Sequence, residues 1–127
     1  MHAALRHRII GKANATTFDL AYNFGDKYEH GTLQNVVVID KTNAATRCEI
    51  FLDHRGYEQY MGVISTLVAN VPKGLNEDLV IVKGEFLIFR FIGVTINDDI
   101  EVYLNGFYDH VLMEHSIDEA IAKFRSY

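Results

Sequence analysis

Apolar and polar side chains alternate along most of this chain, and a period of two is the pattern of a half-buried β-strand. From Phe18 to Phe24 every second side chain is large and apolar, and the alternation recurs in residues 46–53 and 100–107. Turn residues separate these segments, and no helical pattern comes between them. The chain is therefore predicted to be all-β, an antiparallel β-sandwich or jelly-roll-like fold of about seven to eight strands.

Two adjacent strands are predicted in the middle of the chain. Residues 36–39 are β-branched or apolar on both faces, and residues 40–45 are polar turn residues. Residues 46–53 then alternate, so we expect the two strands to pair as a β-hairpin. Glycines predict two interruptions further on: a bulge or bend at Gly62, and a break between strands at Gly84.

The two ends of the chain are predicted to differ from this sandwich, which is expected to span residues 15–108. Residues 1–10 form either an N-terminal arm or a short strand. Ser116 and Glu119 fit a capping box, and apolar residues follow at helical spacing, so a short C-terminal α-helix is expected over residues 116–126. Its apolar stripe must pack on the sandwich or on a neighbouring subunit. Residues 1–127 thus form a single domain.

Composition narrows the range of partners. The formal net charge of −5 disfavours direct nucleic-acid binding, which needs clustered Lys and Arg, and only Arg6, His7 and Arg8 form a small basic group. A single cysteine, Cys48, excludes an internal disulfide and is expected to be a small buried side chain. No apolar run approaches the roughly 18 residues of a membrane-spanning helix, so no membrane contact is expected.

No group of residues predicts catalysis, a metal or a cofactor. Asp109, His110, Glu114 and His115 could ligate a metal, but their spacing differs from HExxH and places the imidazoles on no common helical face. The serines lie in no nucleophile elbow, and there is no phosphate-binding loop. Adjacent carboxylates such as those of Asp99 and its neighbour usually just end a strand. We therefore expect a protein that is not an enzyme; the rival, a small enzyme dependent on His110 or Asp99, has no evident substrate.

Two surface features suggest binding instead. The segment 86–92 is apolar on both faces with one arginine inside it, which predicts either a buried central strand or a subunit interface where that arginine pairs with a carboxylate or stacks on an aromatic ring. Interface candidates from this strand and from both ends of the chain are Arg6, Arg8, Phe89, Arg90, Phe91, Ile117, Ile121 and Phe124. Exposed tyrosines could alternatively form the platform of a carbohydrate-binding module, with Tyr57, Tyr60, Tyr103 and Tyr108 as candidates.

The order of segments carries a further signal. Residues 11–18 read GKANATTF, residues 33–52 combine a valine-rich strand with a polar turn and an alternating strand, and residues 98–106 read DDIEVYLNG. This order resembles that of small β-sandwich structural proteins in the virions of tailed bacteriophages, over about residues 8–108. This chain is more charged than that family pattern.

The resemblance implies a non-enzymatic part of the virion, such as a capsid decoration protein or a head–tail or tail-associated protein. It implies capsid, portal or tail proteins as partners, symmetric homo-oligomers, no cofactor, and a location in the virion after synthesis in the host cytoplasm.

Overall fold

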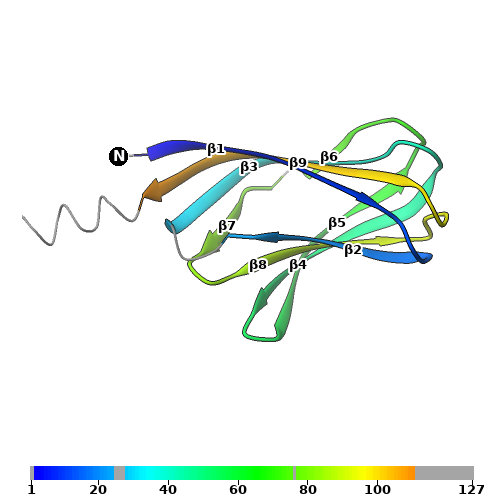
Figure 1. Cartoon of the computed structure of the whole chain (residues 1–127). Coiled ribbons are helices and arrows are strands. Elements are labelled where there is room, and N and C mark those ends of the chain that lie inside the picture. The colour runs from blue at the N-terminus through cyan, green and yellow to red at the C-terminus, as the bar shows by residue number, and fades with distance from the viewer. Residues whose placement is uncertain (1, 25–27, 76, 111–127) are drawn as a thin grey trace, which may run out of the picture.

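The computed structural model describes residues 2–24, 28–75 and 77–110, which fold as two antiparallel sheets packed face to face (Figure 1). The first, here called the β9 sheet, has β9 (Asp99–His110) between β1 (His2–Lys12) and β3 (Tyr28–Asp40). On its other side β3 pairs with β6 (Lys73–Leu75) and β7 (Leu79–Val82). The second, the β8 sheet, has the order β2 (Thr17–Asn23), β8 (Phe86–Ile92), β4 (Ala45–His54) and β5 (Tyr57–Leu67). The predicted β-sandwich is confirmed.

The strand pairs are nested around the connection between β4 and β5. Outward from that turn, β4 pairs with β5, β3 with β6 and β7, β2 with β8, and β1 with β9. A long hairpin that is rolled up in this way gives the strand order of a jelly roll. The described residues contain nine strands, more than the predicted seven to eight, because the segment after Pro72 adds β6.

The predicted hairpin between the central strands is wrong, because β3 and β4 lie in different sheets. β3 already has β9 on one side and β6 and β7 on the other, so no edge is free for β4. At the end of β3, Oδ1 of Asp40 accepts the backbone N–H groups of Thr42 and Asn43, each at 3.0 Å, and the turn carries the chain to the other sheet.

The true hairpin is formed by β4 and β5. Arg55 and Gly56 at its turn have positive φ angles of 53° and 88°, as in the two-residue turns that match strand twist. Oδ1 of Asp53 accepts the N–H of Gly56 at 2.9 Å, which closes the turn. The pairing skips Met61 beside Gly62, so the predicted bulge is confirmed. The predicted break at Gly84 is confirmed as well, by a turn with a φ of 85°.

The N-terminal segment is a strand rather than a free arm. β1 is paired with β9 along its whole length, from His2 opposite Asp109 to Lys12 opposite Asp99. Likewise β3 already begins at Tyr28, within a segment whose composition resembles a loop. The predicted helix at 116–126 lies outside the described residues.

The core lies between the two sheets. The inward side chains of the central strands are fully buried, among them Phe89 and Phe91 of β8 and Val102 and Leu104 of β9. Cys48 of β4 is buried in the same cluster, as expected, and burial raises the pKa of its thiol. The core is apolar along both central strands, which explains why alternation in the sequence was a reliable guide to it.

At Gly106 the backbones of β9 and β3 lie too close together to leave room for a side chain. A Cβ at this position would overlap the backbone carbonyl of Thr32, next to a register shift in β3 between Leu33 and Asn35. Gly106→Ala should lower the free energy of unfolding by about 1–3 kcal/mol, because backbone cannot move aside without strain. Denaturant unfolding measures this. Gly74→Ala, where the new Cβ would lie 3.6 Å from the nearest atom, is the control, and an equal loss in both variants would contradict the explanation.

Candidate functional site

The outer face of the β8 sheet is the candidate site, and it follows from the alternation of β8. Leu87, Phe89 and Phe91 point into the core and are 0% exposed. The alternate residues, which point outward, are Phe86, Ile88, Arg90 and Ile92. The prediction that Phe89 and Phe91 contribute to an interface is therefore wrong, because their side chains are enclosed by the core. The outward residues of β8 are the ones that an interface partner could contact.

Strand register continues this apolar surface across all four strands. Ala21 of β2, Ile88 of β8, Phe51 of β4 and Tyr60 of β5 lie opposite one another in one row. The rings of Phe51 and Tyr60 meet edge to face, with centroids 5.8 Å apart. Phe86 extends the row and is 40% exposed. This row with Phe86 is called the β8 face below.

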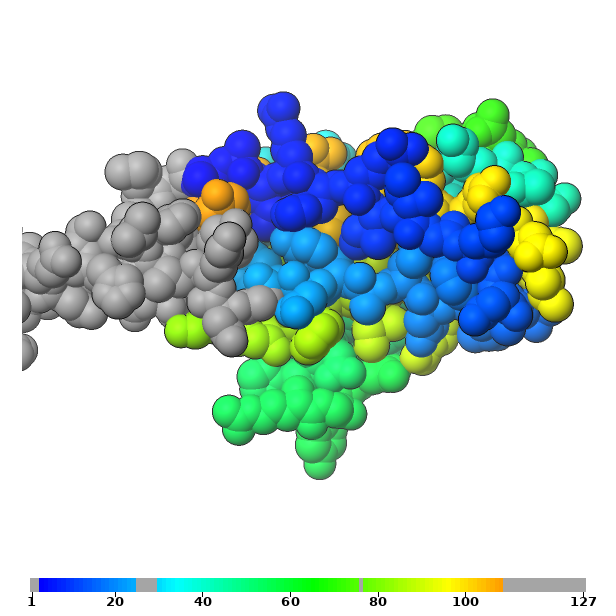
Figure 2. Space-filling view, viewed as in Figure 1, coloured from blue at the N-terminus to red at the C-terminus, as the bar shows by residue number. Residues whose placement is uncertain are grey.

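A groove runs along one side of the β8 face. It has a volume of about 410 Å³ and is lined by Ala21, Asp53, Arg55, Gly56, Phe86 and Ile88. The tip of the β4–β5 hairpin supplies its polar wall and projects from the body of the molecule, as the green atoms in Figure 2 show. The groove thus has an apolar floor and a polar wall.

Arg90 organises the charges beside the β8 face. It forms two hydrogen bonds with Asp19 of β2, at 2.9 and 3.0 Å, and two with Glu58 of β5, both at 3.1 Å. Its guanidinium also lies 4.8 Å from the ring centroid of Phe51. The hydrogen bonds with Asp19 and Glu58 raise the pKa of Arg90. The expected pairing and stacking of Arg90 thus both occur, but within one chain. The positive charge of Arg90 is therefore compensated within the chain, and the two carboxylates leave this surface with an excess of negative charge.

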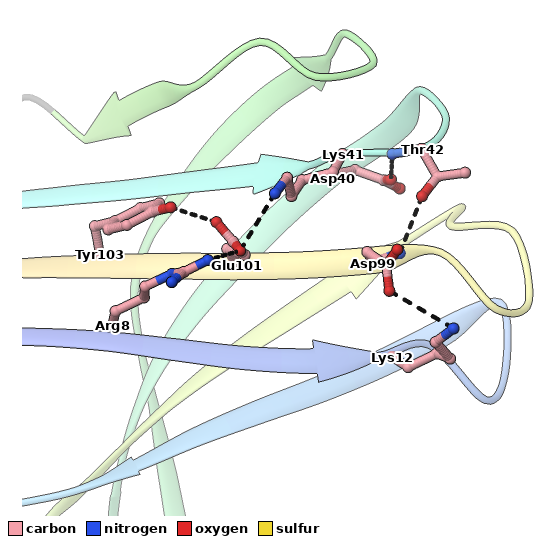
Figure 3. Close-up of polar contacts among 8 residues, drawn as sticks. All are labelled: Arg8, Lys12, Asp40, Lys41, Thr42, Asp99, Glu101 and Tyr103. Carbon is pink, nitrogen blue, oxygen red and sulfur yellow. Dashed lines mark hydrogen bonds and ion pairs between the residues drawn. The ribbon is translucent and has the colours of Figure 1, made fainter.

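The basic residues of β1 lie on the opposite side of the molecule. Arg8 pairs with Glu101 on the outer face of the β9 sheet, and Tyr103 and Lys41 also contact this carboxylate (Figure 3). Glu101 is only 3% exposed, and the hydrogen bonds from Tyr103 and Arg8 lower its pKa. Arg8 is therefore engaged within the chain, while Arg6 is exposed. The remaining interface candidates, Ile117, Ile121 and Phe124, lie outside the described residues.

The four candidate tyrosines do not form one platform. Tyr57 and Tyr60 belong to the β8 sheet, and Tyr103 and Tyr108 belong to the β9 sheet. Tyr57 is 83% exposed but lies three residues from Tyr60, so the two rings point to opposite faces of β5. Tyr103 contacts Glu101 on the outer face, whereas Tyr108 packs against the core.

The described residues contain no group of three or more His, Cys, Asp or Glu side chains that could hold a metal ion. Asp99 is paired with Lys12 at 3.7 Å, and the adjacent Asp98 is buried. The postulated metal ligands Asp109, His110, Glu114 and His115 lie at or beyond the end of the described residues. The described part of the chain contains no helix that is long and apolar enough to cross a membrane.

Of the outward residues of β8, the sequence analysis named Arg90 but missed Phe86, Ile88 and Ile92, although the sequence holds a signal for them. Arg90 sits in an otherwise apolar strand, and a charged residue marks the solvent side. Residues two and four positions away, Ile88 and Phe86, therefore share that side. The partners Asp19 and Glu58 could not be found, because they come from β2 and β5, the two outer strands of the sheet, and the strand order is not visible in the sequence.

Comparison with known proteins finds solved structures with a similar fold but does not assign the chain to a family. No protein-family model matches the chain, and no curated protein matches it. A putative alpha-L-fucosidase from Bacteroides thetaiotaomicron is similar in structure, with a TM-score of 0.53 and 11% identity over 77% of this chain and 21% of the fucosidase chain. The structure of infectious bursal disease virus Gt strain matches with a TM-score of 0.41 and 10% identity, over 87% of this chain and 33% of the viral chain. The chain thus spans a fifth to a third of these proteins, and the first likeness shows a shared fold.

Replacing Arg90 tests its role as the organiser of this surface. Arg90→Lys keeps the charge but cannot form the paired hydrogen bonds with Asp19 or stack flat on Phe51, so the free energy of unfolding should fall by about 1 kcal/mol. Arg47→Lys is the control on the same sheet, because Arg47 makes a single 3.5 Å pair with Glu49 and should lose only about 0.3 kcal/mol. Chemical denaturation of both variants decides the matter: equal losses would show that the network around Arg90 adds nothing.

Proposed function

We propose that this protein is a non-enzymatic structural component of a virion that acts through protein–protein contacts. One observation carries the proposal: the β8 face is a continuous apolar row across four strands, with the neighbouring charges of Arg90 already compensated within the chain. An exposed apolar surface of this kind marks a contact site. Because Arg90 is already paired with two carboxylates, a partner need not supply another, and the apolar row favours an apolar partner surface.

The jelly roll is compatible with this role without proving it. This fold serves in viral capsids and also in lectins, so architecture alone does not fix function. The segment order of residues 8–108, which resembles that of tailed-phage virion proteins, supports the viral reading. We therefore propose a capsid decoration protein or a head–tail or tail-associated protein, with capsid, portal or tail proteins as neighbours.

The size of the face suggests how such contacts gain strength. The whole outer surface of the sheet, of which the β8 face is a part, has four strands about 4.8 Å apart and seven residues at about 3.3 Å each, and it spans roughly 20 by 23 Å. This projected area, roughly 450 Å², is smaller than the roughly 800 Å² per partner of a stable interface. One such contact is weak, so repeated contacts in a symmetric assembly are needed to hold the protein in place. A virion, which displays many copies in a fixed geometry, provides them.

Surface variants test whether the β8 face mediates assembly. We expect self-association of the purified protein at high concentration, measured by size-exclusion chromatography with light scattering. Phe86→Ser combined with Ile88→Asp should abolish it, because both changes place polar groups on the face while the core stays intact. Val80→Ser on the other sheet, where Val80 is 54% exposed, is the matched control and should still associate. Phe89→Ser should instead impair folding, since Phe89 is part of the core.

A strict monomer at all concentrations, with no affinity for phage particles, would count against the proposed role. An unchanged oligomer in the Phe86 and Ile88 double variant would leave a structural role open but would exclude this face. Genes for capsid, portal or tail proteins next to the gene for this chain are expected on the same proposal.

A further inference from the structure

Two buried carboxyl groups face each other at one end of the sandwich, away from the β8 face. Asp40 ends β3 and Asp98 lies in the loop before β9, and the two residues are 0% and 1% exposed. Asn43 bridges the two carboxyl groups: its backbone N–H donates to Oδ1 of Asp40 at 3.0 Å, and its Nδ2 donates to Oδ1 of Asp98 at 2.6 Å. Two buried carboxylates side by side are strongly unfavourable, so an additional positive charge or a proton is required between them.

The hydrogen bonds leave one position for that proton. Oδ1 of Asp40 accepts two backbone N–H groups, from Thr42 and Asn43. Both oxygens of Asp98 have donors: Nδ2 of Asn43 at 2.6 Å and the backbone N–H of Thr95 at 3.1 Å. Oδ2 of Asp40 is buried and has no donor. A hydrogen on this oxygen would be donated to Asp98 and would satisfy the vacant position.

The pair joins loops that are distant in the sequence. The backbone carbonyl of Asp98 accepts the N–H of Ala13, in the β1–β2 connection, at 2.9 Å. The backbone carbonyl of Asp40 accepts the N–H of Asn70, in the β5–β6 connection, at 2.7 Å. With Asn43 and Thr95, the pair therefore contacts four connections between strands. A change in its charge acts on the whole of this end of the sandwich.

We propose that Asp40 and Asp98 share one proton and act as a pH-sensitive latch that holds these four loops together. In the closed state the proton is bonded to Oδ2 of Asp40 and is donated to Asp98. When Asp40 ionises, that O–H bond breaks and the proton passes to water. The two carboxylates then repel each other, and the loops that they join separate.

No neighbouring cation replaces the proton in the contacts of the described residues. Nζ of Lys41 lies 3.5 Å from Glu101, and Nζ of Lys12 lies 3.7 Å from Asp99. Figure 3 draws both pairs. The β1–β2 and β5–β6 connections reach the pair through backbone groups. The charge that Asp40 meets on ionising is therefore the carboxylate of Asp98.

The direction of the pH dependence follows from the two groups. Burial, and then the hydrogen bond with Asp98, raises the pKa of Asp40 from 3.8 to about 6. The folded state thus binds this proton more tightly than the unfolded state, and stability is lost as the pH rises from about 4 to about 6. Burial would raise the pKa of Asp98, but hydrogen bonds from Asp40, Asn43 and Thr95 outweigh it and lower the pKa. Asp98 therefore loses its stabilising effect only in stronger acid, and the pair is most stabilising in mild acid.

Carbon-13 NMR of the aspartate carboxyl groups in the full chain, with amide hydrogen exchange, tests the latch. One carboxyl should titrate near pH 6, and the protection factors of the amides of Thr42, Asn43 and Thr95, corrected for the intrinsic rise of exchange with pH, should fall above that pH. Asp40→Asn can keep both bonds to Oδ1 and can donate from Nδ2 to Asp98. It should abolish the loss of thermal stability between about pH 4 and 6. Asp99→Asn, a change at an exposed neighbour paired with Lys12, should keep the wild-type profile.

Two results would overturn the proposal. One is a titration in which no aspartate has a midpoint above about pH 5, or an Asp40→Asn variant with an unchanged pH profile. The other is a stability gain above pH 6 on addition of calcium that a chelator reverses in the wild-type protein and that Asp40→Asn abolishes. That result would mean that a cation, rather than a proton, occupies the space between the carboxyl groups.

Discussion

The burial of the central strands β8 and β9 in a common core is the constraint on which the rest of this molecule depends. Each lies in the middle of its sheet, and their inward side chains belong to the same buried cluster. Since side chains alternate along a strand, fixing Phe89 and Phe91 inward also fixes Phe86, Ile88 and Arg90 outward. A slip of one residue would bury the arginine and expose two phenylalanines. The composition of the core thus determines the chemistry of the outer face.

The nested pairing of strands explains why this outer face is apolar and yet ordered. β2, β8 and the β4–β5 hairpin come from three separate parts of the chain, and the pairing aligns Ala21, Ile88, Phe51 and Tyr60 in one row. Arg90 then reaches carboxylates on both sides, and its position over Phe51 covers part of that ring. The cation thereby orders the edge of an apolar surface, and its charge is balanced before any partner arrives.

The buried carboxyl groups of Glu101 and Asp40 have opposite pKa shifts because their surroundings differ. Glu101 is nearly buried but is surrounded by Arg8, Lys41 and Tyr103, so its ionised form is stabilised. Asp40 is also buried, and burial together with the neighbouring carboxyl group of Asp98 raises its pKa and favours its neutral form. Two acids of similar exposure therefore differ in pKa direction, because hydrogen bonds and cations outweigh the effect of burial at Glu101 but not at Asp40.

The sequence by itself determined the fold class, most strand segments, the bulge at Gly62, the break at Gly84 and the burial of Cys48. These features are local: alternation, turn residues and glycine positions act over a few residues. It also singled out Arg90 as unusual. It failed on the pairing of β3 with β4, because alternation shows which face is buried but not which strand lies alongside.

Only the tertiary structure decided which residues meet. Segments far apart in the chain meet in the pairing of Arg90, in the row across four strands and in the contact of Asp40 with Asp98. The same arrangement places the tyrosines on different sheets. Such contacts depend on the register and on the order of strands in each sheet. Both are set by the packing of the whole core rather than by any short stretch of sequence.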